Sequence, residues 1–439
     1  MTDSINPPFD VPSRRRFLEA IGALCTAGML PRAAAAASAV SSTAAGGTDT
    51  PPRVFASGRE DGRFVTSTGF IHAHLKHLKP KLEFDPEMNP TDYPAWQDAV
   101  RAKLLELMSF PEFNQPQPPP KLLWSKQQDG YQLQKWEAYP EPYSVVPYLV
   151  LVPDGISAQS PGPGVMCFPG SFSSKESLAG ELELDGKPCS HRHAARNRMA
   201  LEYVRKGIVS VAVENPATNE LDDPIRKGSY EFSVHALWAG RCYESISVFQ
   251  KHHILQWLKQ QPYVDDARIA VSGHSLGAKP ALILGVLDPM IKAVVWNDTT
   301  IDWRRRAVAT NLYRIGTFQY VPGLLAWFDY SDLQASLAPR PFLITEGGRT
   351  AVLNKIRQAY RLLDASDRFT LVYYPKYATP ELRPLDDQPV PEGLSMEEYF
   401  PYANIDAPAH CFKGNIAVPW LVEVLRQGGM AAKPASHEQ

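Results

Sequence analysis

The sequence is poor in cysteine, and its positive and negative charges nearly cancel. Five cysteines occur in 439 residues, with no C-x-x-C spacing, which excludes a dense disulfide framework and the common cysteine-based zinc sites. Lys and Arg number 45 against 47 Asp and Glu, for a net charge of -2, so no general attraction to nucleic acid or anionic membranes is expected. Beyond the N-terminal region, no stretch reaches the roughly 18 consecutive apolar residues of a membrane span.

The residues that are present indicate a soluble globular protein. Apolar residues make up 44% of the chain, enough to fill a substantial core and to exclude global disorder. Proline is the residue in excess, with 40 in the chain, which indicates long, stiff loops. Four cysteines follow the N-terminal region, at positions 167, 189, 242 and 411, and their spacing defines no pairing.

The first residues have the pattern of an export signal. Three arginines at 14–16 precede Phe17 and Leu18, a weakly apolar stretch continues to Leu30, and small residues follow at 37–39. These features define an export signal, and the paired arginines resemble the twin-arginine signal of bacteria. The sequence predicts a signal peptide over 1–39, a flexible lead-in over 40–65, and a periplasmic or secreted protein. The alternative is a basic amphipathic helix.

Residues 66–129 are expected to form an N-terminal helical extension, because Trp96, Val100, Leu104 and Leu107 recur at helix spacing. Three histidines lie close together in this stretch, at positions 72, 74 and 77. No carboxylate or cysteine completes a known metal-binding spacing around them. A solvated or capping role is therefore expected for these histidines, and no metal site is predicted.

Residues 130–430 are expected to form a single α/β domain. Two β-rich runs, Tyr131–Tyr139 and Ser144–Val152, are joined by a proline-containing turn and predict an antiparallel hairpin. Short apolar runs then alternate with amphipathic helices, which indicates a mostly parallel sheet with helices on both faces. A hairpin that leads into such a sheet fits the α/β-hydrolase fold, with a long proline-rich insertion over 375–409.

The expected strands share short, fully apolar stretches: Val165–Phe168, Ile208–Val213, Ile269–Ser272, Ala293–Trp296, Phe342–Thr345 and Thr370–Tyr374. The expected helices lie between or after them: Ser190–Lys206, Cys242–Gln260, Ala278–Leu287, Lys355–Ala365 and Gly414–Gln427. No internal repeat interrupts this alternation, so one domain accounts for the whole region.

The pentapeptide GHSLG at residues 273–277 matches the G-x-S-x-G pattern and predicts a serine nucleophile. It follows an expected strand and opens an expected helix, so Ser275 would occupy a tight turn with its hydroxyl above the sheet. The positive end of the following helix would face negative charge that develops at the serine.

A serine hydroxyl is a weak nucleophile and needs a base. In the α/β-hydrolase fold the base follows the nucleophile and the acid in the chain. Only two histidines follow Ser275, and His437 lies in a polar C-terminal tail. His410 lies just before the last expected helix, where this fold places its base, so His410 is the predicted base.

The acid is left open between two carboxylates. The loop after Phe342–Thr345 usually carries an aspartate, but that position holds Thr350 here, and an uncharged side chain would stabilise a protonated imidazole poorly. Glu346, at the tip of the strand, is the nearest carboxylate. Asp298, at the end of the preceding strand, is the rival, and the third possibility is another residue or no acid at all.

The oxyanion hole needs two backbone N–H groups. One is expected from Leu276, the residue after the nucleophile, and the other from the loop that follows strand Val165–Phe168. In that loop Gly170 lets the backbone turn toward the substrate, and Ser171 or Phe172 would donate.

The region 263–277 resembles the acetyl xylan esterase and dienelactone-hydrolase-like branch of the α/β-hydrolases. So does the stretch Ala338–Pro341 before the penultimate strand, together with the Glu-Gly-Gly at 346–348. The resemblance implies a serine hydrolase that cleaves an ester, often of an acetylated sugar, through an acyl-enzyme. Two departures from that branch stand out: Pro169 where it usually has histidine, and Thr350 where it has aspartate.

The expected substrate is a small-molecule or carbohydrate ester, and no cofactor is expected. Trp238 and Trp303 are candidate sugar-binding residues beside the insertion, although either aromatic side chain could equally belong to the core. Two other functions stay open: a non-catalytic binding member of the fold, suggested by Thr350, and a serine peptidase of the prolyl-oligopeptidase type. The oligomeric state is not indicated.

Overall fold

The computed structural model describes residues 55–171, 173–181, 183–184, 187–188, 196–223, 228–310 and 316–426. The predicted signal peptide over 1–39 and most of the lead-in lie outside the described residues. No helix in the described part of the chain is long and apolar enough to cross a membrane.

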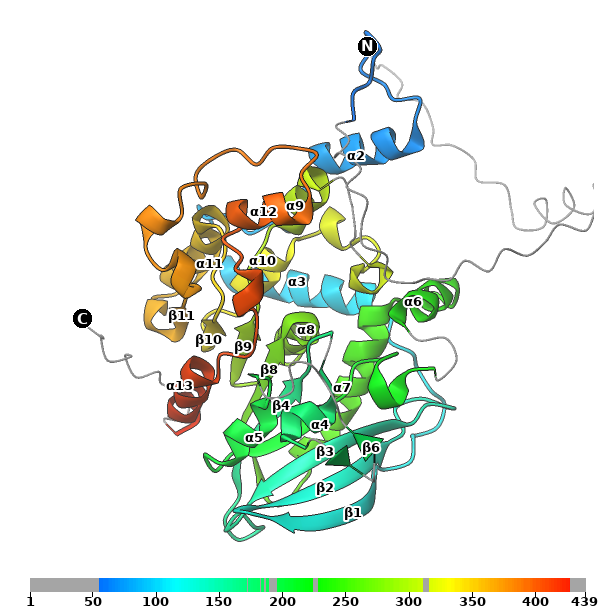
Figure 1. The fold of residues 1–439 in the computed structure, drawn as a ribbon, viewed down its shortest axis with the longest axis vertical. Helices are drawn as coiled ribbons and strands as arrows, with labels where there is room; N and C mark the ends of the chain where they lie inside the picture. Colours follow the sequence, from blue (N-terminus) through cyan, green and yellow to red (C-terminus); the bar gives the residue numbers. More distant parts are fainter. Residues whose placement is uncertain are drawn as a thin grey trace, which may run out of the picture. The chain divides into compact units, whose positions relative to one another are not determined.

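Within the described residues, nine strands form one sheet in the order β1-β2-β3-β7-β4-β8-β9-β10-β11 (Figure 1). Strands β1, β2 and β3 pair antiparallel, and β3 pairs antiparallel with β7. The six strands β7, β4, β8, β9, β10 and β11 are parallel to one another. The strands are β1 Lys121–Gln128, β2 Tyr131–Ala138, β3 Val146–Pro153, β4 Gly162–Phe168, β7 Val209–Val213, β8 Val264–His274, β9 Ala293–Asn297, β10 Phe342–Ile344 and β11 Phe369–Leu371. A separate small hairpin consists of β5 Glu183–Leu184 and β6 Lys187–Pro188. The mostly parallel sheet and the antiparallel hairpin are confirmed.

The helices cover both faces of the sheet. They are α2 Ser67–His77, α3 Tyr93–Met108, α4 Lys175–Ala179, α5 Met199–Val204, α6 Ser229–Trp238, α7 Tyr243–Lys259, α8 Ala278–Leu287, α9 Trp303–Ala309, α10 Tyr330–Ala335, α11 Thr350–Leu362, α12 Met396–Tyr402 and α13 Gly414–Arg426. One core cluster joins α3, α7, α8, α10 and α11 to the sheet, and a second joins α4, α5 and α13.

Alternation along the strands explains the two clusters. In β4, Met166 and Phe168 belong to the first cluster, whereas Val165 and Cys167 belong to the second. Successive side chains of a strand point to opposite faces, so an entirely apolar strand supplies both cores. The α/β-hydrolase arrangement that the sequence predicts is therefore present.

The N-terminal extension packs on the sheet domain through α3. Trp96, Val100 and Leu104 are buried in the first core cluster, as the helix spacing predicts, whereas Leu107 is only partly buried and the next residue, Met108, takes the buried position. The sheet itself begins earlier than Gly130, however, because β1 already pairs with β2. Strand β1 is almost entirely exposed at the sheet edge, so its sequence has no buried face to reveal it.

Several element boundaries also differ from the sequence prediction. Helix α5 begins at Met199 rather than Ser190, and residues 189–195 lie outside the described part. Helix α11 begins at Thr350 rather than Lys355, and strand β11 ends at Leu371 rather than Tyr374. The insertion over 375–409 contains α12, which packs on α9 in a small apolar cluster (Figure 1).

Candidate active site

Ser275 lies on the tight turn between strand β8 and helix α8. Its φ is 52°, a left-handed conformation that residues with a side chain adopt rarely and that is common at functional sites. The flanking glycines permit the turn, because a Cβ on Gly273 would lie 2.1 Å from the carbonyl oxygen of Gly277. A Cβ on Gly277 would lie 2.4 Å from the carbonyl oxygen of Phe168. The G-x-S-x-G pattern is thus a steric requirement of this turn.

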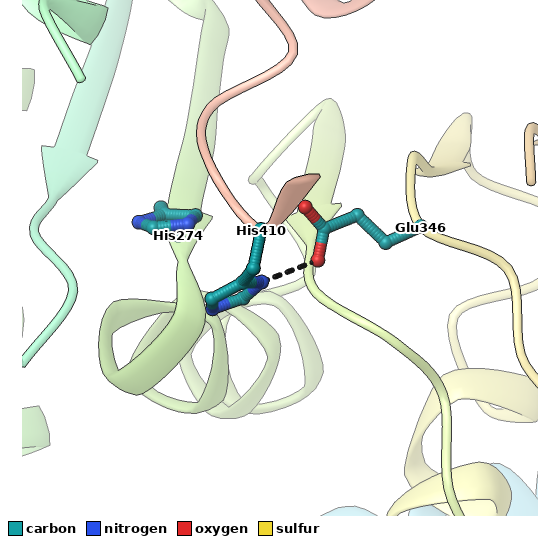
Figure 2. Close-up of side chains that lie close together, drawn as sticks. All are labelled: His274, Glu346 and His410. Atoms are coloured by element: carbon teal, nitrogen blue, oxygen red, sulfur yellow. Dashed lines mark hydrogen bonds and ion pairs between the residues drawn. The ribbon is translucent and has the colours of Figure 1, made fainter. Parts of the chain in front are cut away.

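His410 and Glu346 come together from two different loops. Glu346 follows β10, His410 precedes α13, and Nδ1 of His410 lies 2.6 Å from Oε2 of Glu346 (Figure 2). An ionised carboxylate can only accept a hydrogen bond, so Nδ1 carries a proton, and in the neutral ring Nε2 is left as the acceptor. Burial by itself would lower the pKa of His410, but the attraction of Glu346 outweighs it and raises that pKa to about 9.

The Glu346 carboxylate is fully buried and accepts from four groups. The Tyr374 hydroxyl donates to Oε2 at 2.5 Å, beside His410, while Lys413 Nζ at 2.8 Å and the Cys411 N–H at 3.3 Å donate to Oε1. Burial by itself would raise the pKa of Glu346. The attraction of His410 and Lys413 outweighs it and lowers that pKa to about 2. Glu346 is therefore ionised at neutral pH.

The rival carboxylate, Asp298, lies close to the same histidine without bonding to it. Its Oδ1 accepts from the backbone N–H of Thr299 at 2.7 Å. Burial raises the pKa of Asp298, the charge on Glu346 raises it further, and His410 lowers it. Of the two candidate acids, the structure brings Glu346 within hydrogen-bonding distance of His410.

Thr350, at the position where an aspartate is expected, has a structural partner. Its N–H and its hydroxyl donate to the two carboxylate oxygens of Asp386, at 2.9 and 2.5 Å. Asp386 lies in the insertion and also accepts from the Asn404 side chain at 3.0 Å. Thr350 therefore joins the start of α11 to the insertion instead of orienting His410.

The candidate oxyanion loop follows strand β4. Ser171 lines the same cavity as Leu276 and Ser275, while Phe172 lies outside the described residues. A Cβ on Gly170 would lie 2.8 Å from His274 Nδ1 and 3.2 Å from the Ser275 Cβ. Glycine is thus required where this loop approaches the nucleophile.

A buried ion-pair network holds the far end of this loop. Lys175, the first residue of α4, is fully buried and contacts the carboxylates of Glu176 at 2.6 Å, Glu214 at 3.1 Å and Glu220 at 2.6 Å. Asn219 joins the network to the loop, because its amide donates to Glu214 at 3.0 Å and to the Ser173 carbonyl oxygen at 3.1 Å. The loop conformation is therefore linked to charges that are not themselves in the pocket.

A cavity of about 250 Å³ opens beside the serine turn, and Ser275 and His410 both line it. The insertion supplies one wall through Met396, Phe400, Ile405 and Ala407. Trp303, one of the two predicted aromatic contacts, lines the cavity as well.

The structure does not bring Trp238 to this cavity, and that prediction is corrected. Trp238 is the last residue of α6 and is 90% exposed. Ala236 is buried, and a residue two positions further along a helix points to a different side. Trp238 therefore faces solvent.

Sequence reasoning missed three residues of this site. Tyr374 and Lys413 hold Glu346, while Lys279 lines the cavity. One signal was available, because Lys279 lies four residues after Ser275, in the first turn of α8. Tyr374 and Lys413 are brought in by loops, and no local pattern marks them. Arg306 also lines the cavity, and it belongs to the arginine run at 304–306, which by sequence alone could contact an acidic substrate group or form a solvated face.

Two histidines and one carboxylate also lie close enough for a metal site. Ligand atoms of His274, Glu346 and His410 lie within 4.8 Å of one another, with the two rings side by side in Figure 2. However, the Lys413 ammonium lies against the same carboxylate and would repel a divalent cation. The other carboxylate oxygen already accepts from His410 and Tyr374. These contacts fit an acid–base pair better than a metal centre.

The sheet order, the strained serine turn and the histidine–carboxylate pair at the strand ends define an α/β-hydrolase. The chain belongs to the Abhydrolase family, whose model matches residues 49–423. A crystal structure from Bacteroides fragilis, named a "putative acetyl xylan esterase", is 35% identical with a TM-score of 0.78, and the match covers 83% of this chain and 97% of that one. These similarities support a hydrolase.

A shorter match joins the chain to a protein of Bacillus subtilis named "Putative hydrolase YtaP". The two are 32% identical over 111 residues, which is 25% of this chain and 35% of that protein. The match therefore spans little more than a third of the curated relative.

Proposed function

We propose that this protein is a serine hydrolase that cleaves carboxylic esters through an acyl-enzyme on Ser275. The observation that carries the proposal is the 2.6 Å hydrogen bond between His410 and Glu346, in a cavity that Ser275 also lines. A histidine oriented by a buried carboxylate, in a cavity wall that also holds a serine on a tight turn, is the arrangement that activates a hydroxyl for attack on a carbonyl carbon.

In the mechanism, Nε2 of His410 takes the Ser275 proton as the oxygen attacks the ester carbonyl carbon. The ionised Glu346 stabilises the imidazolium that forms, and the Leu276 and Ser171 N–H groups bind the developing oxyanion. His410 then protonates the leaving alcohol, and an acyl group remains on Ser275. Water, deprotonated by His410, attacks the acyl carbon; the bond to the Ser275 oxygen breaks, His410 returns the proton to that oxygen, and the acid is released. No cofactor takes part.

An acylated carbohydrate is the proposed substrate. The similarity to the Bacteroides fragilis protein, at 35% identity over most of both chains, supports this substrate class. Trp303 also lines the cavity, where the apolar part of its side chain adds contact surface for a sugar. Acetylated xylo-oligosaccharides should therefore be deacetylated, while a panel of peptides should remain uncut. Cleavage of the peptides alone would favour the peptidase alternative.

A fluorophosphonate probe tests the nucleophile directly. The intact protein should be labelled on Ser275 and should hydrolyse p-nitrophenyl acetate, and Ser275→Ala should lose both properties. Ser125→Ala is the matched control, because Ser125 is exposed on the edge strand β1 and should keep both. Hydrolysis retained by Ser275→Ala would contradict the proposal, and an unlabelled, inactive native protein would favour a binding function.

We also propose that residues 1–39 direct export through a twin-arginine route, on the strength of the arginine run at 14–16 and the small residues at 37–39. Replacement of the three arginines by lysine should retain the precursor in the cytoplasm. N-terminal sequencing of the exported protein should begin near Val40, and an exported protein that still begins at its first residues would contradict the cleavage site.

A further inference from the structure

Two cationic side chains line the cavity beside Ser275 without an acidic partner in contact. Lys279 on α8 is 3% exposed, and its Nζ donates to Gln319 Oε1 at 2.9 Å. Arg306 on α9 contacts the Met396 sulfur with Nη2 at 3.8 Å, and its buried Nε has no hydrogen-bond partner among the described residues. Neither cation forms an ion pair within the described ranges.

Trp303 holds both cations on its ring. Lys279 Nζ lies 3.9 Å from the ring centroid, and the guanidinium carbon of Arg306 lies 4.9 Å from it. A ring quadrupole attracts cations but does not neutralise them. The cavity wall beside Ser275 therefore carries two positive charges, and both lie against the Trp303 ring.

The nearby carboxylates compensate these charges only in part. Glu244 is buried behind Lys279 and acts on it through space, and neither of its oxygens has a hydrogen-bond partner in the described part of the chain. Burial lowers the pKa of Lys279 to about 8, since the repulsion of Arg306 adds to it while Glu244 and Asp298 oppose it. Lys279 is therefore still mostly protonated at neutral pH. Among the described residues that line the cavity, Asp298 is the one carboxylate that could balance the two cations.

We propose that the cavity binds an ester that also carries a free carboxylate, held by Arg306 and Lys279. This inference rests on the proposed esterase function and names its substrate class. The planar guanidinium matches the two oxygens of a carboxylate, and the ammonium adds a point charge. Asp298 is the one carboxylate among the described residues that line the cavity, so the cavity wall leaves the two cations without a full complement of negative charge, which a carboxylate of the substrate would supply.

The carboxylate can belong to either half of the ester, and matched pairs distinguish the two. The first pair is an acetylated methyl glucuronoside and the corresponding acetylated methyl glucoside, which differ at the carboxylate of the alcohol half. The second pair is p-nitrophenyl hydrogen succinate and p-nitrophenyl valerate, which differ at the end of the acyl half. In one of these pairs the wild-type kcat/KM should be about 10- to 100-fold higher for the anionic member, as expected for a charge-assisted hydrogen bond.

Arg306 is the residue to change, because removal of Lys279 would also take from the buried Glu244 one of the two cations that act on it. Arg306→Gln should bring the ratio of anionic to neutral kcat/KM close to one, and Arg306→Lys should retain part of it. Arg305→Gln is the matched control on the same helix, since Arg305 is exposed and pairs with Asp302. Its ratio should equal the wild-type ratio.

A binding measurement separates failure of this inference from failure of the proposed function. Calorimetry on the Ser275→Ala protein should detect methyl glucuronoside or succinate, whichever matches the preferred pair, and Arg306→Gln should weaken that binding about 10-fold or more. If p-nitrophenyl acetate is hydrolysed but both ratios are near one, the carboxylate site is wrong and the esterase stands. If nothing is hydrolysed but Arg306-dependent binding persists, the esterase is wrong and the carboxylate site stands. Neither hydrolysis nor binding would overturn both.

Discussion

Replacement of Glu346 by glutamine keeps the size of the side chain but removes its charge and one of its two accepting oxygens. The carboxylate accepts four hydrogen bonds, two on each oxygen. An amide has one accepting oxygen and one NH₂ group that donates. Whichever carboxylate oxygen the NH₂ group replaces, it would face two hydrogen-bond donors. The His410 ring would lose its acceptor in one orientation of the amide, and the Lys413 ammonium would lose its acceptor in the other. The substitution therefore removes the charge and disturbs the ring orientation together.

The size of the effect follows from the pKa of His410. That pKa lies at about 9, against an ordinary value of 6.5, and a difference of this size corresponds to about 3 kcal/mol of interaction with the imidazolium. Loss of that interaction alone would slow the reaction by a factor on the order of 10² to 10³. Loss of the correct ring tautomer slows the reaction further. In serine proteases, replacement of the triad aspartate by asparagine lowers kcat by about 10⁴. We expect Glu346→Gln to lower kcat by about 10⁴.

The pH profile provides a second measurement of the same interaction. Catalysis requires neutral His410, so kcat/KM should rise with pH and level off above the pKa of His410, which lies at about 9. Asp298 also raises that pKa and Lys413 lowers it. In Glu346→Gln the attraction that raises the pKa is gone, so the midpoint of the profile should move down toward 6.5. The measurement is blank-corrected kcat/KM for p-nitrophenyl acetate between about pH 5 and about pH 10.

Asp298→Asn is the matched comparison, because Asp298 is the other carboxylate near His410. It should lower kcat by clearly less than Glu346→Gln and leave most of the upward displacement of the midpoint in place. A loss of about 10⁴ in Asp298→Asn with a mild effect of Glu346→Gln would refute the assignment of Glu346 as the acid. Small effects of both would mean that the third member is uncharged or absent.

Three further predictions follow from the residues around the site. Lys175→Met leaves three carboxylates without their buried cation and should lower the free energy of unfolding by about 3 to 5 kcal/mol in urea denaturation. The control is Lys79→Met at an exposed position, which should change the free energy of unfolding by less than about 0.5 kcal/mol. Equal effects of the two substitutions would contradict the buried network. Gly170→Ala should lower kcat for p-nitrophenyl acetate by about 10² or more, because the oxyanion loop must move away from Ser275. In the control Gly164→Ala, the new Cβ makes only ordinary contacts, from 3.4 Å, so this variant should keep its activity. Incubation with EDTA should leave hydrolysis unchanged, and a loss restored by zinc would favour the metal arrangement.

Hydrophobic pattern predicted the interior of the sheet because buried strands and helices must be apolar on the faces they bury. All six predicted parallel strands are present, and α7, α8 and α13 lie within a few residues of their predicted ranges. The pattern failed where burial is absent, as in the exposed edge strand β1. It also failed where a distant side chain decides a boundary, since Asp386 supports the start of α11 at Thr350.

Motif and chain order were sufficient to propose Ser275 and His410, but they could not choose the acid. Glu346 and Asp298 both follow strands of the same sheet, and the ends of neighbouring parallel strands lie close together. The choice depends on which carboxylate reaches the His410 ring, and that depends on how the loop before α13 folds back over the sheet. Lys413 and Tyr374 then fix the carboxylate that was reached.

The sequence by itself determined the fold class and the position of the serine turn, because alternation and a glycine-bound turn are local properties of the chain. Only the tertiary structure decided the partner of His410, the solvent exposure of Trp238 and the pair of cations beside Ser275. Those features join residues far apart in the sequence, and hydrogen bonds and charges act over a few ångströms of space whatever the number of residues between them.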